Sequence, residues 1–380
     1  EKIETQKDDL RLAWKSNKAH EIFAEAQDML AHDPVLAFNL MRWADKTLEG
    51  RDTLVRQTIE KTYLNHSLSR TFSGEGSSVL ATAFSPDGRL VLTGNANGAA
   101  ILLDLQSDKK RILTGHTGAV QAVAFSPDGQ FALTGGTDGT ARLWSLNGKQ
   151  LQIFKGHISW VHSVAFSPDG KLILTGSRDE TARLWNLQGQ ELQQYKKHNG
   201  KVLCVAFSPD GEYVLTGSTD QTAMLWSRNG RRRRTFREHT GAVSAVAFSP
   251  DGKTILTGSQ DSTAILADLR GHRLQTFRKH SGRVTSATFS PGGHTVLTGS
   301  DDGTAILYDL QGTELETFRG HRGPVYTVAF SPGGEALVTG SKDETVKYWE
   351  LAKYVSRQFR GHIGGATALA VAPNGKTILT

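Results

Sequence analysis

A histidine, a threonine and an aspartate recur together along the sequence, a combination that performs nucleophilic hydrolysis when the three side chains meet in one site. His116, Thr134 and Asp138 form one such set, and the same residue types return at intervals of 41 residues. A hydrolase needs a single triad, whereas this set is present in nearly every unit of a repeat. The recurrence therefore indicates a structural role, and we predict no catalytic residues in this chain.

Other patterns that suggest chemistry are weak. Residues 252–254 and 375–377 both read Gly-Lys-Thr, as at the end of a phosphate-binding loop, but the glycine required five residues earlier is Ala247 or Ala370. The histidines fall about one to a unit, too far apart to share a metal ion. The single cysteine, Cys204, lies in an apolar run, which favours a packed thiol. We expect no cofactor and no metal.

A repeat of 41 residues runs through most of the chain. The sequence Ala-Phe-Ser-Pro-Asp-Gly begins at Ala83, and its phenylalanine returns at a constant interval, with Val371 at the last position of the series. The phenylalanines are Phe84, Phe125, Phe166, Phe207, Phe248, Phe289 and Phe330. A period near 40–45 residues is typical of four-stranded propeller blades or of helical-pair solenoids.

The residues within one unit favour strands. Between Thr117 and Gly156, four short runs rich in apolar residues are separated by turns that contain glycine. Asp128-Gly129 and Asn147-Gly148 are strong hairpin signals, and Pro127 would interrupt a helix. Each unit is therefore predicted to be an antiparallel sheet of four strands, which excludes helical repeats.

Two further features make these units resemble the WD-repeat β-propellers. A histidine, often preceded by glycine, stands before the first strand, and a tryptophan ends the third strand in most units. The histidines are His116, His157, His198, His239, His280, His321 and His362, and the tryptophans are Trp144, Trp185, Trp226 and Trp349. The resemblance covers about residues 68–380 and implies a mainly β fold, a propeller of seven blades with the start of further repeats.

The resemblance also implies what the recurring polar residues do. In this family an Asp, a His, a Ser or Thr and a Trp of one blade form a buried chain of hydrogen bonds. The matching sets are His116, Thr134, Asp138, Trp144; His157, Thr175, Asp179, Trp185; His198, Thr216, Asp220, Trp226; and His321, Thr339, Asp343, Trp349. Ser177 and its equivalents are an alternative source of the hydroxyl. The pattern is broken by Ala267 and Tyr308 in place of Trp, and by Glu75, Asn97 and Leu103 in the first unit.

The repeat defines three predicted regions. Residues 1–66 carry apolar residues at helical spacing and are expected to form a helical linker bundle. Residues 67–359 form the seven-bladed propeller, in which the strand 68–72 completes the last blade and closes the ring. Residues 360–380 start an eighth repeat and end halfway through a blade. The sequence is therefore expected to be a segment of a longer chain, with a second propeller or a larger ring.

The helical prefix resembles the stretch that precedes the propeller in bacterial signalling proteins of the NACHT and related P-loop ATPase (STAND) type. The resemblance rests on the Asp-Pro-x-x-Ala pattern within residues 31–44, Ala-His-Asp-Pro-Val-Leu-Ala-Phe-Asn-Leu-Met-Arg-Trp-Ala. It implies that effector and nucleotide-switch domains precede this segment. A helical cap that only shields the propeller is the alternative.

Charge and composition narrow the choice of partner. The net charge is +6, with 22% charged residues. Acidic residues are interspersed with the basic ones, so nucleic acid is an unlikely partner. The densest basic run is Arg231 to Arg234, with Arg228 and Arg237 nearby, at the start of an expected outer strand where charge discourages edge pairing. No apolar run is long enough to span a membrane, and one cysteine favours the cytoplasm.

Positions at which otherwise similar units differ are candidates for ligand binding. The family resemblance places the residues that enter the first strand, and those before the turn Asp, on one rim of the propeller near its channel. Large or charged residues at these positions are Trp160, His162, Arg178, Lys201, Arg283, Tyr326 and Lys342. Trp, Tyr and Arg are the residue types that dominate binding hot spots, so we predict a protein partner on this rim.

The function that these observations favour is non-catalytic protein recognition, by the sensing or autoinhibitory C-terminal part of a larger bacterial signalling or defence protein. In that hypothesis, binding at the rim relieves contacts with upstream domains of the same chain. Two alternatives stay open. The propeller is a constitutive scaffold, or it directs a hydrolase or protease domain that lies upstream to its target.

Overall fold

The computed structural model describes residues 68–351, 370–371 and 378–379. The predicted helical linker of residues 1–66, its Asp-Pro-x-x-Ala pattern, and residues 352–369 lie outside the described residues.

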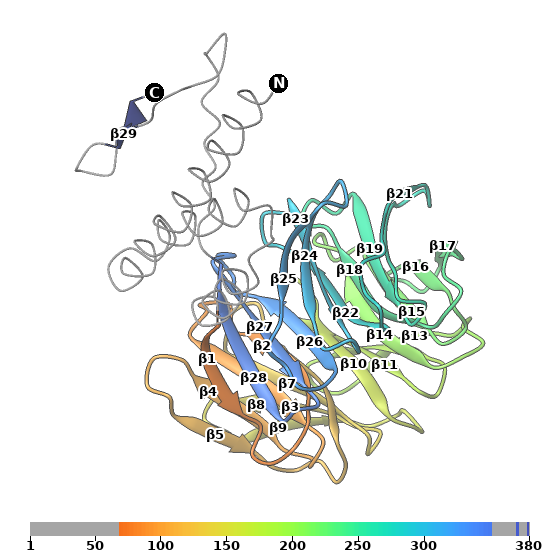
Figure 1. The fold of residues 1–380 in the computed structure, drawn as a ribbon. Coiled ribbons are helices and arrows are strands. Elements are labelled where there is room, and N and C mark those ends of the chain that lie inside the picture. Colours follow the sequence, from red (N-terminus) through yellow and green to blue (C-terminus); the bar gives the residue numbers. More distant parts are fainter. Residues whose placement is uncertain (1–67, 352–369, 372–377, 380) are drawn as a thin grey trace, which may run out of the picture.

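Seven antiparallel sheets of four strands are arranged around a ring, which confirms the predicted propeller (Figure 1). The strands of the first six sheets follow one another along the chain, numbered here as blades 1 to 6. Blade 1 contains β2 (Val79–Phe84), β3 (Leu90–Asn95), β4 (Ala100–Asp104) and β5 (Lys110–Leu113). Blade 2 contains β6 (Val120–Phe125), β7 (Phe131–Gly136), β8 (Ala141–Ser145) and β9 (Gln150–Phe154). Blade 3 contains β10 (Val161–Phe166), β11 (Leu172–Ser177), β12 (Ala182–Asn186) and β13 (Glu191–Tyr195).

The remaining blades repeat this order. Blade 4 contains β14 (Val202–Phe207), β15 (Tyr213–Ser218), β16 (Ala223–Ser227) and β17 (Arg232–Phe236). Blade 5 contains β18 (Val243–Phe248), β19 (Thr254–Ser259), β20 (Ala264–Asp268) and β21 (Arg273–Phe277). Blade 6 contains β22 (Val284–Phe289), β23 (Thr295–Ser300), β24 (Ala305–Asp309) and β25 (Glu314–Phe318). Blade 7 contains β26 (Val325–Phe330), β27 (Ala336–Ser341), β28 (Thr345–Glu350) and β1 (Leu68–Ser73).

Blade 7 closes the ring with strands from both ends of the propeller. β1 pairs antiparallel with β28, and Phe72 lies opposite Val346. Figure 1 shows the orange β1 beside the blue β28. The first strands of blades 1 and 7 contact each other, as first strands of neighbouring blades do elsewhere in the ring. The prediction that residues 68–72 complete the last blade is therefore confirmed, and the pairing removes an exposed edge at β28.

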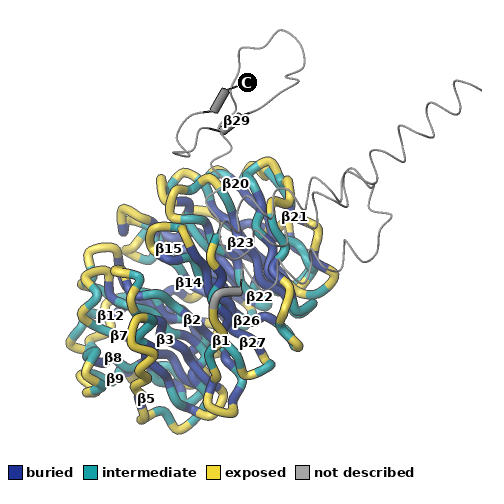
Figure 2. Tube along the Cα trace, turned by 60° about the vertical axis from the view of Figure 1, so that its left-hand side comes forward, coloured by how far each residue is buried: buried dark blue, intermediate teal, exposed yellow. Residues whose placement is uncertain are grey.

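The core lies between neighbouring blades. The second strands are buried along nearly their whole length, the first strands, which line the channel, are partly buried, and the outermost strands begin with exposed residues (Figure 2). The glycine of the Leu-Thr-Gly pattern permits this approach: a Cβ on Gly176 would lie 2.7 Å from Cγ1 of Val205 in the next blade. Adjacent sheets can therefore pack without a gap.

The short hairpin at the end of the chain keeps the register of the blades. In β29 (Ala370–Val371) and β30 (Ile378–Leu379), Val371 lies opposite Ile378. The equivalent pair one repeat earlier is Phe330 and Leu337. The start of an eighth repeat, with a second propeller or a larger ring, stays a prediction.

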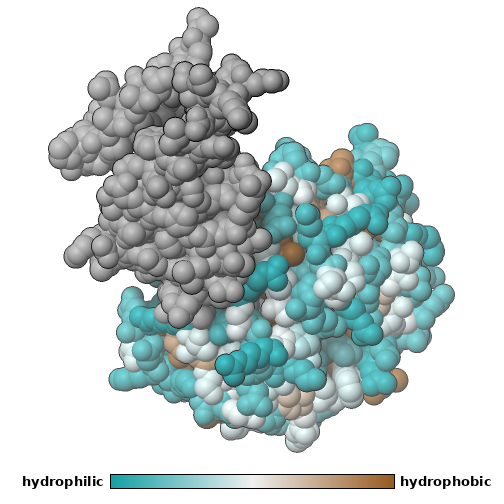
Figure 3. All heavy atoms as spheres, in the orientation of Figure 1, coloured by the Kyte–Doolittle hydropathy of each residue, from teal (hydrophilic) through white to brown (hydrophobic). Residues whose placement is uncertain are grey.

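The described residues include no helix with the length and apolarity needed to cross a membrane. On the face seen in Figure 3, the propeller surface is mostly hydrophilic, with a few separate hydrophobic residues.

Candidate functional site

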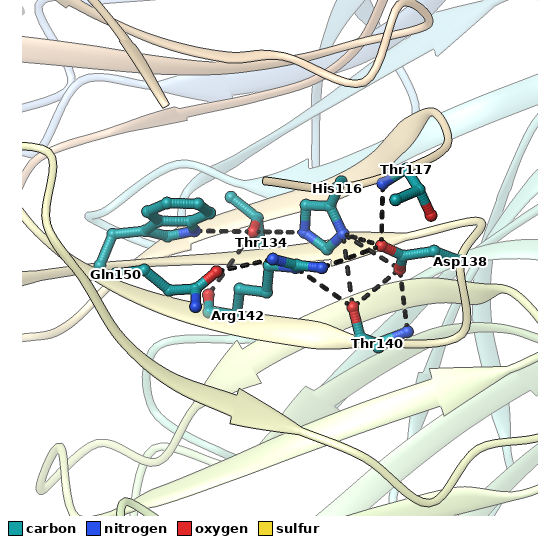
Figure 4. Close-up of polar contacts among 8 residues, drawn as sticks. His116, Thr117, Thr134, Asp138, Thr140, Arg142 and Gln150 are labelled. Carbon is teal, nitrogen blue, oxygen red and sulfur yellow. Dashed lines mark hydrogen bonds and ion pairs between the residues drawn. The ribbon is translucent and has the colours of Figure 1, made fainter. Parts of the chain in front are cut away.

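In blade 2 the four residues of the predicted set form a continuous chain of hydrogen bonds (Figure 4). Nε1 of Trp144 donates to Oγ1 of Thr134 over 2.9 Å. Nε2 of His116 lies 2.8 Å from the same oxygen, and Nδ1 lies 2.9 Å from Oδ2 of Asp138. The chain joins the third strand to the second strand and to the loops at one end of the blade.

The acceptors and donors of this chain determine its protonation. A carboxylate only accepts, so Nδ1 of His116 carries the hydrogen that faces Asp138. Nε2 then accepts from the hydroxyl of Thr134, whose oxygen accepts from Trp144. Burial lowers the pKa of His116, opposed by the charge of Asp138. A neutral imidazole therefore satisfies each polar atom of the chain, as buried polar groups require.

The same geometry recurs in blades 3, 4 and 7. The hydroxyl is that of Thr in each, and Ser177, the alternative, instead donates to the backbone carbonyl of Ser159. Distances from His Nε2 to Thr Oγ1 are all 2.7 Å, and distances from His Nδ1 to Asp Oδ2 are 2.7–2.8 Å. The residues are His157, Thr175, Asp179 and Trp185 in blade 3, His198, Thr216, Asp220 and Trp226 in blade 4, and His321, Thr339, Asp343 and Trp349 in blade 7.

Blades 5 and 6 retain three of the four members, which the sequence-based sets did not include. His239, Thr257 and Asp261 are hydrogen-bonded in blade 5, and His280, Thr298 and Asp302 in blade 6. A second hydroxyl, two residues after each Asp, was also missed: Thr181 donates to Asp179 over 2.6 Å. All of these residues recur at the 41-residue interval, so the repeat itself could have identified the missed residues.

Blade 1 has no such chain. Glu75 occupies the position of His and pairs at the surface with Lys110 over 2.6 Å. Ser77 accepts from the backbone N–H of Asn97. Oγ1 of Thr93 and both polar atoms of Asn95 are buried without a hydrogen-bond partner among the residues that the structure describes. Such atoms cost free energy, so blade 1 lacks part of the stabilisation that the other blades have.

Burial excludes these chains from catalysis. Thr134 is fully buried, and only 1% of the His116 side chain is exposed. A nucleophile must meet its substrate, and this hydroxyl already has its partners inside the sheet. Within the described part of the chain, no cluster of three or more His, Cys, Asp or Glu side chains is suited to a metal ion. These chains therefore hold the strands and loops together.

The stability of the propeller is expected to fall on acidification. Burial lowers the pKa of His116, His198 and His321 below 6.5, and each must stay neutral to accept from Thr. Burial alone would raise the pKa of Asp343, but hydrogen bonds from Thr345, the Arg322 backbone and His321 together lower it to about 2. For the His and the Asp groups alike, the pKa in the folded protein lies below the pKa in the unfolded chain. Between these two pKa values the unfolded chain binds more protons, so the stability that these groups contribute at higher pH is lost as pH falls through this range.

Urea unfolding at pH 7, 5.5 and 4 measures this effect. We expect the midpoint to decrease from pH 7 to 5.5 as the His groups of the unfolded chain protonate, and again towards pH 4 and below as the Asp groups do. A midpoint that is constant from pH 7 to 4 would contradict the assigned protonation.

Four of the predicted rim residues lie together at the surface of blades 3 and 4, and the N–H of Ile158 donates to Oδ2 of Asp179, the neighbour of Arg178. We call Ile158, Trp160, His162, Arg178 and Lys201 the Trp160 patch. The guanidinium carbon of Arg178 lies 4.7 Å from the centre of the Trp160 ring, and the His162 ring meets that ring edge-on at 5.9 Å. Trp160 is 40% exposed and Ile158 is 90% exposed.

Backbone geometry brings these side chains together. The N–H of Arg178 donates to the carbonyl of Trp160 over 2.9 Å, which fixes the two loops beside each other. His162 stands at a register shift between Val161 and Ser163, and such a bulge redirects a side chain. Ile158 was not among the predicted rim residues. The repeat could have identified Ile158, because the equivalent position in other units is polar. The residues there are Thr117, Asn199, Thr240, Ser281 and Arg322.

His162 has no charge at neutral pH. Burial, and then the charges of Lys201 and Arg178, lower its pKa to about 4. Lys201 enters the first strand of blade 4, so this effect links the patch across two blades. The surface therefore combines an aromatic and aliphatic centre with two cations.

The other predicted rim residues lie on different blades. Arg283 enters β22 of blade 6, and Tyr326 and Lys342 belong to blade 7. No contact joins these three to the Trp160 patch in the part of the chain that the structure describes, and at least one whole blade intervenes on either path around the ring. The predicted rim residues therefore divide into the Trp160 patch and a second set on blades 6 and 7.

Comparison with known families agrees with this architecture. A family model described as the IFT122 first beta-propeller matches residues 78–320, which is more than half of the chain. The chain belongs to this family. A model described as WD domain, G-beta repeat also matches residues 312–350. No curated protein matches the chain. WD-repeat propellers are typically protein-interaction modules and generally non-catalytic.

Proposed function

We propose that this propeller binds a protein partner through the Trp160 patch, as a non-catalytic recognition module. The observation that carries the proposal is the exposed Trp160 ring held between Arg178 and His162. A large aromatic surface fixed before binding loses little conformational entropy when a partner covers it.

The chemistry of the patch suggests the kind of segment that it recognises. Ile158 and Trp160 offer apolar area, and Arg178 and Lys201 offer two positive charges, while His162 is neutral. A peptide with an apolar side chain next to an acidic one is complementary to this arrangement. Arg283, Tyr326 and Lys342 are proposed as a secondary contact of a partner that extends over the rim.

In the same proposal the propeller is the C-terminal sensing or autoinhibitory part of a larger bacterial signalling or defence protein. Binding at the patch would compete with domains upstream in the same chain. This requires that a partner bind the released state more tightly than the inhibited one.

Selection of peptides from a display library on the full chain, followed by calorimetric titration, tests the binding site. Trp160→Ala and Arg178→Glu are each expected to weaken binding of a selected peptide about tenfold or more, as expected when a hot-spot residue is removed. Leu192→Ala and Lys171→Glu are matched controls, because Leu192 is 47% exposed on outer strand β13 and Lys171 lies at the other end of blade 3. Equal affinity in all four variants would contradict the proposal.

A further inference from the structure

The basic run on the outer strand of blade 4 borders a cavity. Its volume is about 200 Å³, and it is lined by Lys197, Asn199, Asp220, Thr222, Met224, Arg232 and Arg237. Three of the seven lining residues are cations, and all three are exposed. Among the described residues none of the three has an ion pair with an acidic side chain.

Blade 3 contains an internal ion pair at the equivalent place. Nη1 of Arg183 lies 2.7 Å from Oε2 of Glu191, and Nη2 lies 3.9 Å from Oδ2 of Asp179. Blade 2 is similar, because Nη1 of Arg142 donates to Oε1 of Gln150 over 2.6 Å. In these blades an arginine of the third strand therefore contacts a side chain of the outer strand.

Blade 4 has lost both halves of that pair. One repeat after Arg183 stands the uncharged Met224, and one repeat after Glu191 stands the cation Arg232. A third change adds charge, since Lys197 replaces the glycine Gly156. The space therefore has two new cations, and the outer strand no longer supplies the carboxylate that Glu191 provides in blade 3.

Asp220 adds one negative charge against the three cations of the lining, and its oxygens are already engaged as acceptors. Oδ2 accepts from His198 over 2.8 Å and from the backbone N–H of Asn199 over 3.0 Å. Oδ1 accepts from the hydroxyl of Thr222 over 2.7 Å. The positive charges of the cavity therefore face a carboxylate committed to the buried chain of blade 4.

From these contacts we infer that the cavity on blade 4 binds a phosphate group, carried by a small molecule or by a phosphorylated peptide. Guanidinium groups bind phosphate oxygens through paired hydrogen bonds, and an ammonium adds a point charge. A single phosphate group does not fill the cavity, which leaves room for the group that carries it. This inference uses none of the residues of the Trp160 patch, so its test does not depend on the proposed function.

Titration of the full chain with inorganic phosphate and with O-phosphoserine, followed by calorimetry at about 0.15 M ionic strength, tests the inference. We expect saturable binding of both probes. Arg232→Gln and Lys197→Gln are each expected to weaken it about tenfold, because each removes a charge-assisted hydrogen bond. The double change Met224→Arg with Arg232→Glu restores the pair found in blade 3 and is expected to abolish binding.

Arg233→Gln is the matched control, because it removes the same charge from the next residue of β17, and that residue does not line the cavity. It should retain the wild-type affinity. Circular dichroism melting of each variant verifies folding, and the double variant should melt at or above the wild-type temperature. The inference is overturned if neither probe saturates, if Arg233→Gln weakens binding as much as Arg232→Gln, or if citrate binds as tightly as the phosphate probes.

Discussion

Replacing Trp185 with alanine is expected to lower the free energy of unfolding by about 3–5 kcal/mol, the usual cost of removing a large buried aromatic side chain. Trp185 is 2% exposed and packs edge-on against Phe154 and His157 at 6.0 and 6.2 Å. Its Nε1 donates to Thr175 over 2.9 Å, so the substitution also removes a donor from the buried chain of blade 3.

Two variants separate the packing contribution from the hydrogen bond. Trp185→Phe keeps most of the apolar area and is expected to cost about 1–2 kcal/mol, because it mainly removes the donor to Thr175. Trp160→Ala removes a tryptophan of the same blade that is 40% exposed, and should change stability by less than about 1 kcal/mol. Chemical denaturation of the three variants supplies the comparison. A Trp185→Ala protein as stable as Trp160→Ala would contradict the assigned role.

Blade 5 indicates how the fold tolerates the natural absence of this tryptophan. Ala267 occupies the position, and a cavity of about 10 Å³ remains, lined among others by Phe236, Glu238 and His239. The side chain of Glu238 stands where blades 2, 3 and 7 have glycine. In blade 3 the equivalent residue is Gly156, which has no side chain to occupy the space left by a missing tryptophan. In the native protein Trp185 occupies this space, since a Cβ on Gly156 would lie 2.8 Å from its Cη2. We therefore expect the full loss of unfolding free energy when Trp185 of blade 3 is replaced by alanine.

Replacing Leu68–Ser73 in the full chain by a glycine-serine sequence of equal length is expected to cost about 3 kcal/mol or more. Each ladder hydrogen bond contributes about 0.5–1.5 kcal/mol, and β1 supplies the whole outer ladder of blade 7. β1 also connects to blade 1, since Nη1 of Arg70 donates to the carbonyl of Leu105 over 2.5 Å. Without β1, the ladder groups of β28 become an unpaired edge.

Hydrogen exchange distinguishes ring closure from a general loss of stability. Amides of β28 should exchange faster in the β1 variant, whereas the same replacement in β21 of blade 5 should leave them protected. The β21 variant is the control because its strand is an equivalent outer strand but does not join the two ends of the propeller. Unchanged protection of β28 in the β1 variant would show that closure does not depend on this strand.

Much of the fold could be predicted because it is set by residues close together in the chain. Asp128-Gly129 defines a hairpin, and Gly129 has the positive φ of 69° that the turn needs. Alternating residues define each strand, and a constant interval places His116, Thr134 and Asp138 at fixed positions in a sheet. The same interval also places a His, a Thr and an Asp in blades 5 and 6. These two sets were not predicted because the pattern was taken to require a tryptophan, which both blades lack.

The binding surfaces could be predicted only in part. The positions of Trp160 and Arg178 follow from the repeat, but their stacking depends on the loop contact between residues 160 and 178. The participation of Lys201 depends on the packing of blade 4 against blade 3. Nothing in the one-dimensional pattern showed that the basic run at Arg232 borders a cavity, because this requires knowing that Met224 of the third strand and Arg232 of the outer strand line the same space.

The sequence by itself determined the repeat, the strands, the turns and the members of the buried hydrogen-bonded chains, because each depends on local backbone preferences and on neighbours in one sheet. The sequence also predicted the closure of the ring by residues 68–72, whereas the tertiary structure decided the grouping of one rim cluster and the cavity on blade 4. These depend on the angles at which twisted sheets pack against each other. Such angles are the sum of many side-chain contacts between blades, and no short stretch of sequence encodes them.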